Sequence, residues 1–415
     1  MFVNIIWLGL FFAGFAAALW QTVQGDWGAF ARLIEALFGA AQTGFEVALG
    51  LTGMMALWLG FMRVGERAGV VAWLARAVNP LLRQLMPGVP AGHAAQGAVT
   101  LNVSANLLGL DNAATPLGLK AMQELQSLNA HPRIATDAQI VFIALNTAGL
   151  TLIPTSVIAL RQTVALQQGL AGFNAADIFL PTLLVTVSSL LAALLALAVV
   201  QRLPLWRPAF ALPALAALAL VGALAVWLAA LPAQQAAQWM GLIGSACIAA
   251  VVALFLGAGA LRGVNVYEAF VEGAREGFEV AVRIIAYLVA MLAAIAVFRA
   301  AGLMDALLAA IGASVQALGL PTDFLPALPV GLMKVLSGSG ARALMVDVLQ
   351  THGADSFAGK LAAIIQGSTE TTLYVLAVYG GSVGLQNTRH ALPCALFADA
   401  VGLVAAVVVA YAFFT

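Results

Sequence analysis

The sequence predicts an all-α polytopic membrane protein, with two inverted-topology repeats, interrupted or re-entrant helices and about nine full spans. Its 415 residues are 63% hydrophobic and only 9% charged, whereas soluble domains carry roughly 25% charged residues. Apolar runs long enough to cross a bilayer recur along the whole chain. The short sequence Gly-Phe-Glu-Val-Ala also occurs twice, at 44–48 and at 277–281.

The features that follow each copy of this short sequence occur in the same order. Each copy opens an apolar run, which leads to a charged tail, a Gly/Ser/Asn/Pro-rich stretch and a Thr-rich apolar run. Duplicated units with broken polar segments are typical of secondary transporters. We therefore predict one repeat over 1–200 and a second over 239–415. The linker 201–238 contains one extra span, which inverts the second repeat.

The predicted full spans are runs of predominantly apolar residues. They lie near 1–20, 43–62, 139–160, 178–200, 210–231, 239–261, 277–298, 360–380 and 390–414. The first run lacks a basic start and a cleavage site, which favours a retained helix over a signal peptide. Two further stretches, 93–126 and 324–351, are long enough to enter the membrane but are interrupted by polar residues.

Two amphipathic stretches follow the repeated spans. Apolar residues between Val70 and Leu85 share one helical face, and Leu303 to Leu318 is the corresponding stretch of the second repeat. Such a helix lies in the membrane interface or packs as a short helix outside the membrane. The sequence leaves both arrangements open.

The distribution of arginine predicts the orientation of the chain. Basic residues mark cytoplasmic loops. Arginines follow the second span and occur in the loops 201–209 and 262–276, whereas the loop 232–238 is uncharged. We therefore expect a multi-pass protein of the bacterial inner membrane with a cytoplasmic N-terminus and an external C-terminus.

The first interrupted stretch predicts two half-helices that meet between Gly109 and Thr115. Asn102 and Asn106 lie four residues apart and share a helical face. Gly109 permits a break, and the residues after it are suited to cap a new helix. A surface loop that caps an ordinary helix is the alternative. The candidate ligands here are Asn102, Asn106, Asp111, Asn112 and Thr115.

The second interrupted stretch contains Ser337-Gly-Ser-Gly340, which is expected to open a helix that continues through Gln350. A glycine-rich helix start lets backbone N–H groups approach an anion. Arg342 follows in the first turn and supplies a positive charge. The candidate ligands of this stretch are Ser337, Ser339 and Arg342.

Two Thr-rich runs complete the candidate site. They contribute Asn146 and Thr147 from the first repeat, and Ser368, Thr369 and Glu370 from the second. A carboxylate within an apolar run is a functional candidate, for coupling to Na⁺ or H⁺ or for binding a donor on the solute. A structural partnership with Lys334, Arg342 or backbone groups is the alternative for Glu370.

The motifs in both repeats resemble known families. The stretch Asn102 to Gln126 resembles the spore maturation protein A family. The stretch Leu328 to His390, with Ser-Gly-Ser-Gly and Gln-Gly-Ser-Thr-Glu-Thr-Thr-Leu-Tyr within it, resembles the spore maturation protein B family. The two resemblances make the first repeat A-like and the second B-like. Both families belong to the nucleoside recognition (Gate) group, which includes parts of concentrative nucleoside transporters. The resemblance implies an inner-membrane protein and suggests solute movement, or a role in spore-core dehydration.

Together these patterns favour a permease for a small polar solute, either nucleoside-like or a small anionic or zwitterionic metabolite, that works by alternating access between inverted repeats. The alternative is a membrane sensor or an envelope or spore-maturation component that binds a ligand or partner without moving it. We expect no enzyme activity, no catalytic residues, no metal centre and no cofactor beyond a coupling ion, because the required motifs are missing. The expected partners are the lipid bilayer and the solute, and no nucleic acid; small residues in the spans permit a homodimer.

Overall fold

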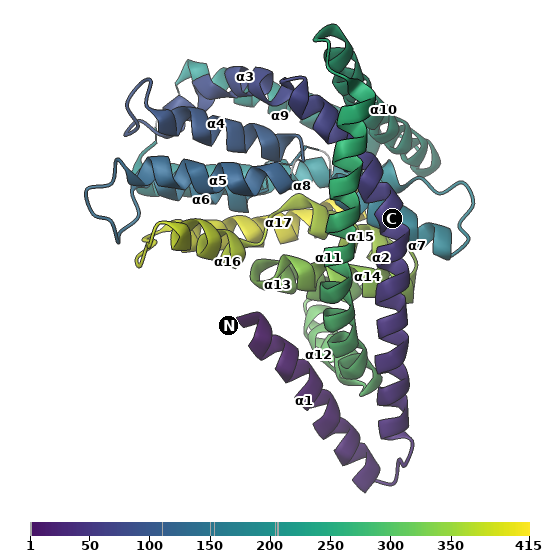
Figure 1. Cartoon of the computed structure of the whole chain (residues 1–415). Coiled ribbons are helices and arrows are strands. Elements are labelled where there is room, and N and C mark those ends of the chain that lie inside the picture. The colour runs from purple at the N-terminus through teal and green to yellow at the C-terminus, as the bar shows by residue number, and fades with distance from the viewer. Residues whose placement is uncertain (1, 110, 150, 153, 204, 206) are drawn as a thin grey trace. The chain divides into compact units, whose positions relative to one another are not determined.

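A computed structural model describes the chain except for residues 1, 110, 150, 153, 204 and 206. The described residues form helices joined by short loops (Figure 1). Eight helical stretches of the described chain are long and apolar enough to cross a membrane, and one of them, Phe357–Gly380, contains a break. The prediction of an all-α polytopic membrane protein is confirmed.

The helices of the first half follow the predicted order. They are α1 (Phe2–Val23), α2 (Ala29–Arg67), α3 (Val70–Leu85), α4 (Ala94–Leu107), α5 (Asp111–Gln126), α6 (Asp137–Thr147), α7 (Thr155–Gln167), a 3₁₀ turn (Ala175–Ile178) and α8 (Phe179–Gln201). The linker helix is α9 (Pro208–Ala229), with Pro208 in its first turn, where proline is well tolerated.

The helices of the second half repeat this order. They are α10 (Ala233–Leu261), α11 (Val266–Ala300), α12 (Leu303–Ala317), a 3₁₀ turn (Leu325–Ala327), α13 (Leu328–Leu336), α14 (Gly338–His352), α15 (Phe357–Ser368), α16 (Thr372–Val375), a π-helical turn (Leu376–Gly380) and α17 (Ala391–Phe414). In each half, a long helix is followed by a short helix, a pair of helices, a broken helix and a membrane-length helix. The order of long, short and broken helices is therefore the same in the two halves.

Two of the expected spans are not continuous helices. The expected span 139–160 is divided between α6 and α7, because Gly149 adopts a positive φ of 71° and Pro154 precedes the second helix. The expected span 360–380 is interrupted between Ser368 and Thr372. The first break lies beside Pro154, which predicts an interruption of that span, whereas the second break was not predicted. Both breaks fall in the Thr-rich runs.

The described chain forms two compact units, each assembled from separated segments. Unit 1 consists of Met1–Leu59, Ser156–Phe173 and Ala274–Gln366, and unit 2 consists of Gly60–Thr155, Asn174–Gly273 and Gly367–Thr415. Each unit therefore takes segments from both halves of the sequence. The boundaries 1–200, 201–238 and 239–415 describe repeats along the chain and stay a prediction.

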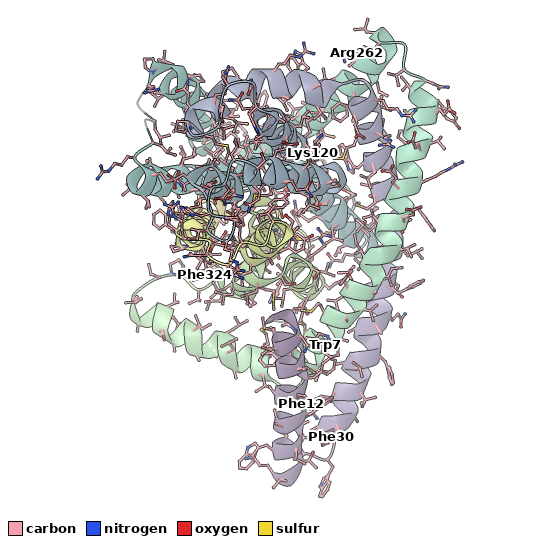
Figure 2. The ribbon with its side chains drawn as sticks, turned by 60° about the vertical axis from the view of Figure 1, so that its left-hand side comes forward. Trp7, Phe12, Phe30, Lys120, Arg262 and Phe324 are labelled. Carbon is pink, nitrogen blue, oxygen red and sulfur yellow. The ribbon has the colours of Figure 1, made fainter. Side chains whose placement is uncertain are left out.

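In unit 1, α1 packs against α11. The indole N–H of Trp7 donates to the carbonyl oxygen of Ala290 at 2.8 Å, and Gln21 donates to the carbonyl oxygen of Ala301 at 3.0 Å. Aromatic side chains on α1 and on the start of α2 are exposed, with Phe12 66% exposed and Phe30 42% exposed (Figure 2). Large apolar side chains exposed along a helix of this length are typical of a surface that faces lipid.

Elsewhere in unit 1, hydrogen bonds join the α7 region to the end of α14. Arg161 on α7 is fully buried, donates to the carbonyl oxygen of Ala354 at 3.1 Å and lies 4.8 Å from the Phe173 ring centroid. Gln168, also near the end of α7, donates to the carbonyl oxygen of Leu349. These contacts satisfy backbone carbonyl groups where α14 ends, which a helix end buried in an apolar environment requires.

Unit 2 contains an extended group of buried apolar residues, and its helices α3, α4 and α5 lie side by side (Figure 1). The apolar face of α3 packs against α4. The helices α8 and α17 also pack together, and Ser189 on α8 donates to the carbonyl oxygen of Ala398 at 3.1 Å. This core holds the ends of the broken helices in fixed positions.

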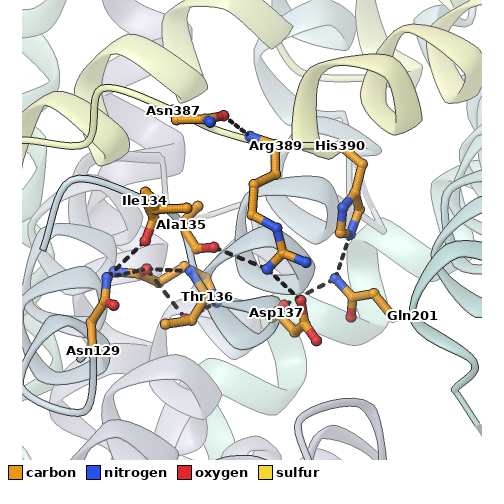
Figure 3. Close-up of polar contacts among 10 residues, drawn as sticks. Asn129, Ile134, Ala135, Thr136, Asp137, Gln201, Asn387, Arg389 and His390 are labelled. Carbon is orange, nitrogen blue, oxygen red and sulfur yellow. Dashed lines mark hydrogen bonds and ion pairs between the residues drawn. The ribbon is translucent and has the colours of Figure 1, made fainter. Parts of the chain in front are cut away.

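The loops that precede α6 and α17 are joined in unit 2. The backbone N–H of Ala135 donates to the carbonyl oxygen of Asn387 at 2.9 Å, and Arg389 forms an ion pair with Asp137 (Figure 3). His390, at the start of α17, lies 2.9 Å from the amide nitrogen of Gln201. Because that amide nitrogen is a donor, the facing ring nitrogen must be unprotonated to accept.

We predict that acid weakens this junction through His390. Burial and the charge of Arg389 lower the pKa of His390 below its ordinary value, and the Asp137 carboxylate partly opposes them. The unfolded chain therefore binds this proton more tightly than the folded chain. The stability contributed by neutral His390 is complete above pH about 6.5 and falls as the pH drops from there towards the lowered folded pKa.

The measurement is the melting temperature of the purified protein across this pH range. His390→Gln should flatten the decline, because glutamine does not titrate. The matched control is His131→Gln, at an exposed position in the loop before α6. Equal declines in wild type and in both variants would refute the role of His390.

Candidate functional site

The two helix breaks of unit 2 meet through their backbones. The N–H of Glu370 donates to the carbonyl oxygen of Thr147 at 3.0 Å, where α6 ends. The carbonyl oxygen of Ser368, at the end of α15, accepts from Thr186 on α8 at 2.9 Å. A Cβ atom added to Gly149 would lie 2.5 Å from the Ser368 carbonyl oxygen. Only glycine allows the two breaks to approach this closely.

The helix pair α4–α5 reaches the same place. The expected break at Gly109 is confirmed, because α4 ends at Leu107, Gly109 has a φ of 71°, and α5 begins at Asp111. The N–H of Leu152, between α6 and α7, donates to the carbonyl oxygen of Leu107 at 3.1 Å. The turn between α4 and α5 is therefore joined to the first helix break, between α6 and α7.

Three asparagine side chains form a connected network at this junction. The amide nitrogen of Asn106 donates to the side-chain oxygen of Asn146 at 2.8 Å and lies 3.4 Å from that of Asn102. Asn102 is fully buried and donates to the carbonyl oxygen of Ala114 on α5, and Asn146 donates to the carbonyl oxygen of Phe142. Buried amides that are tied together in this way stay in fixed orientations.

Tyr379, in the π-helical turn, extends this network and was not predicted from the sequence. It is 6% exposed, it lies within hydrogen-bonding reach of Asn102, and its ring centroid is 5.4 Å from that of Phe142. A Cβ atom on Gly118 would lie 2.4 Å from the Tyr379 hydroxyl oxygen, so this glycine provides the space for the ring. Tyrosine in an apolar run carries no signal that separates this role from ordinary packing.

Glu370 is half-buried at the second break, close enough for its charge to act on Tyr379. Its carboxylate has no hydrogen-bond or ion-pair partner among the described residues. Lys334, one of the partners considered from the sequence, is buried in unit 1 and donates to the carbonyl oxygen of Gln366 at 2.7 Å. The carboxylate is therefore available to a donor or a cation that the chain itself does not supply.

The predicted ligands divide between the two units. Unit 2 holds those of the first repeat and of the second helix break: Asn102, Asn106, Thr115, Asn146, Thr147, Ser368, Thr369 and Glu370. The hydrogen bonds above link Asn102, Asn106 and Asn146 to one another and Thr147 to Glu370, and Ser368 bonds to Thr186. Thr115 is half-buried in the first turn of α5, and Thr369 lies between Ser368 and Glu370. The side chains of Asp111 and Asn112 lie outside the described residues.

Unit 1 holds Ser337, Ser339 and Arg342. Ser337 caps α14, and its hydroxyl oxygen accepts from the backbone N–H of Gly340 at 3.1 Å and lies 3.2 Å from that of Ser339. The predicted helix start at this serine is confirmed. Arg342 is half-buried in the first turn, and the acidic residue downstream, Asp347, pairs with Arg299 instead. The ligand role of these three residues stays a prediction.

The fold and the site define a class of protein: a polytopic α-helical membrane protein with a duplicated order of elements, in which the polar site lies at helix breaks. The sequence matches the nucleoside recognition (Gate) family twice, over residues 48–163 and 281–386. The chain belongs to this family, and the two matched ranges include both helix breaks.

Two relatives from Bacillus subtilis (strain 168) are similar to the chain. It is 42% identical to spore maturation protein B over 171 residues, which is 41% of this chain and 93% of the relative. It is 35% identical to spore maturation protein A over 193 residues, which is 46% of this chain and 92% of the relative. No solved structure matches the chain.

Proposed function

We propose that the protein is a permease of the bacterial inner membrane that moves a small polar solute by alternating access. The contact between the two helix breaks in unit 2 is the observation that supports this most strongly. Broken membrane helices expose backbone groups that hydrocarbon cannot satisfy, so they are found where a cavity or a ligand supplies partners. Ends of helices also place partial charges of both signs at one position.

The chemistry of the junction favours a solute that carries both donors and acceptors. Asparagine amides present one acceptor oxygen and two N–H donors in a fixed plane, which suits the edge of a nucleobase or an amide. The Glu370 carboxylate suits a hydroxyl pair or an amine on the same solute. A nucleoside carries both kinds of group, and a small zwitterionic metabolite shares part of this pattern.

Glu370 is the proposed coupling residue, acting through H⁺ or Na⁺. A half-buried carboxylate at membrane depth costs free energy unless it is protonated or paired. The bound ion would neutralise the Glu370 carboxylate, and the ion and the solute would bind together at the junction. We further propose a cytoplasmic N-terminus and an external C-terminus, from the arginine distribution.

The two relatives favour a second candidate function, because both are spore maturation proteins. A membrane component that binds a ligand or partner without moving it would use the same junction as a sensor. A sensor of this kind would bind the ligand as the permease does, but it would not move the ligand across the membrane.

A ligand screen by thermal shift tests the binding step. The purified protein is heated with single nucleosides, amino acids, dicarboxylates or sodium. A ligand present at 100 times its Kd stabilises the folded state by about 2.7 kcal/mol, which raises the melting temperature. We expect one solute class to do so for the wild type and not for Asn146→Ala.

The matched control for this screen is Asn265→Ala, at the exposed residue before α11. This variant should respond to ligand as the wild type does. Equal ligand-induced shifts in Asn146→Ala and the wild type would rule out the junction as the binding site.

A further inference from the structure

A cavity in unit 2, of about 350 Å³, lies away from the helix breaks and is partly open. It is lined by residues from the end of α3, the end of α5, the start of α6 and the end of α8. Its wall is apolar and consists of Leu85, Met86, Val89, Leu125, Leu128 and Leu203. Its polar groups are concentrated on one side, at Thr136, Asp137, Gln201 and Arg389 (Figure 3). An apolar wall with a few convergent polar groups is the usual composition of a small-molecule site.

Arg389 is held in place at the edge of this cavity by its backbone and by its side chain. Its φ of 50° is unusual for a residue other than glycine, and its backbone N–H donates to the Asn387 side chain at 2.8 Å. Its Nη1 atom donates to the Asp137 carboxylate at 2.7 Å and to the carbonyl oxygen of Ala135 at 3.2 Å. Its Nη2 and Nε atoms make no hydrogen bond to the described residues. A guanidinium with donors left over suits an oxyanion.

The same edge also offers acceptors. The second oxygen of the Asp137 carboxylate has no partner among the described residues. The amide nitrogen of Gln201 donates to the Asp137 carbonyl oxygen and to His390. The side-chain oxygen of Gln201 is buried and has no hydrogen-bond partner in the described part of the chain. A buried acceptor without a donor costs free energy, so a donor from a ligand would be favourable there.

From this geometry we propose that the cavity binds a phosphoethanolamine group, and that the group is the headgroup of a membrane lipid. The phosphate pairs with the free donors of Arg389. The primary ammonium donates to Asp137 and Gln201, and the glycerol and the start of the acyl chains lie along the apolar wall. The cavity adjoins the ends of the membrane-length helices α8 and α17, which is the depth at which lipid headgroups lie.

The charges at the edge select a zwitterion. A ligand with only negative charge would place its phosphate beside the Asp137 carboxylate without a compensating group, and like charges at this distance repel. A choline headgroup has the right net charge, but its quaternary nitrogen carries no N–H donor for Asp137 or Gln201. Only a headgroup that joins a phosphate to a protonated amine supplies both an acceptor for Arg389 and N–H donors for Asp137 and Gln201.

The test is binding of defined lipids to the delipidated, detergent-purified full chain, measured by native mass spectrometry. The lipids are phosphatidylethanolamine, phosphatidylcholine and phosphatidylglycerol with the same acyl chains, and soluble phosphoethanolamine forms a separate arm. We expect phosphatidylethanolamine to bind at least about tenfold more tightly than the other two lipids, because charge-assisted hydrogen bonds differ between them. Asp137→Asn and Arg389→Gln should each remove this preference.

Two variants complete the design. Leu128→Trp fills the apolar wall and leaves the charged edge intact, so its loss of lipid binding cannot be attributed to a broken ion pair. Arg32→Gln, in the exposed pair with Asp26 of unit 1, removes an arginine elsewhere and should bind as the wild type does. Equal affinities for the three lipids, or full binding to Leu128→Trp, would overturn the proposal. Binding of soluble phosphoethanolamine as tight as that of the lipid would overturn the lipid source.

Discussion

Gly149→Ala should destabilise the folded protein by about 2–4 kcal/mol and abolish solute binding, since it combines an unfavourable φ with overpacking. The added Cβ atom would lie 2.5 Å from the Ser368 carbonyl oxygen and 2.7 Å from the Thr369 Cα atom. Both are backbone atoms, so no side chain can move aside. The two helix breaks would have to separate, and the hydrogen bond from Glu370 to Thr147 would be lost with them.

The matched control is Gly169→Ala. Gly169 has a φ of 69°, close to that of Gly149, but a Cβ atom there would meet nothing within 4 Å. The control therefore has only the conformational cost, about 1 kcal/mol. Thermal melting in detergent compares the two variants. If both lose the same stability, the close contact between the breaks does not exist.

Glu370→Gln should reduce solute uptake about 10- to 100-fold and remove its dependence on pH or sodium, because a hydrogen bond to a charged group contributes about 1.5–3 kcal/mol. Glutamine keeps the size of the side chain and removes its charge and its titration. Uptake is measured with the purified variant in proteoliposomes, with and without sodium, at several pH values.

Glu279→Gln is the control for this variant. Glu279 belongs to the repeated sequence at the start of the expected span 277–298, and its side chain is exposed on α11. Its replacement removes one negative charge from the chain without touching a helix break. The coupling role is wrong if Glu370→Gln leaves uptake and its ion dependence unchanged.

Helix positions were predictable wherever one stretch of sequence contains the whole signal. The stretch Val70–Leu85 is a helix with the predicted bounds, and Leu303–Ala317 ends one residue before its prediction. Their apolar periodicity and the glycines before them act locally. The break at Gly109 was predictable for the same reason, because a glycine followed by capping residues is a local signal.

The breaks in the Thr-rich runs were harder to predict because they depend on contacts between distant residues. Pro154 indicates a disturbed helix, but the positive φ of Gly149 is compensated by packing against Ser368 and Thr369, more than 200 residues later. The pairing of Asn106 with Asn146 and the place of Tyr379 depend on the same tertiary packing. A sequence shows that these residues are polar and does not show which of them meet.

The central claim is that the junction of the two helix breaks binds and moves a solute. The most direct measurement is uptake of radiolabelled nucleosides, amino acids and dicarboxylates into proteoliposomes that contain the wild-type protein, against empty liposomes and against Asn146→Ala. We expect saturable uptake of one class by the wild type, lost in the variant. Absence of uptake of every class by folded wild-type protein would contradict the permease and favour a membrane component that binds without transport.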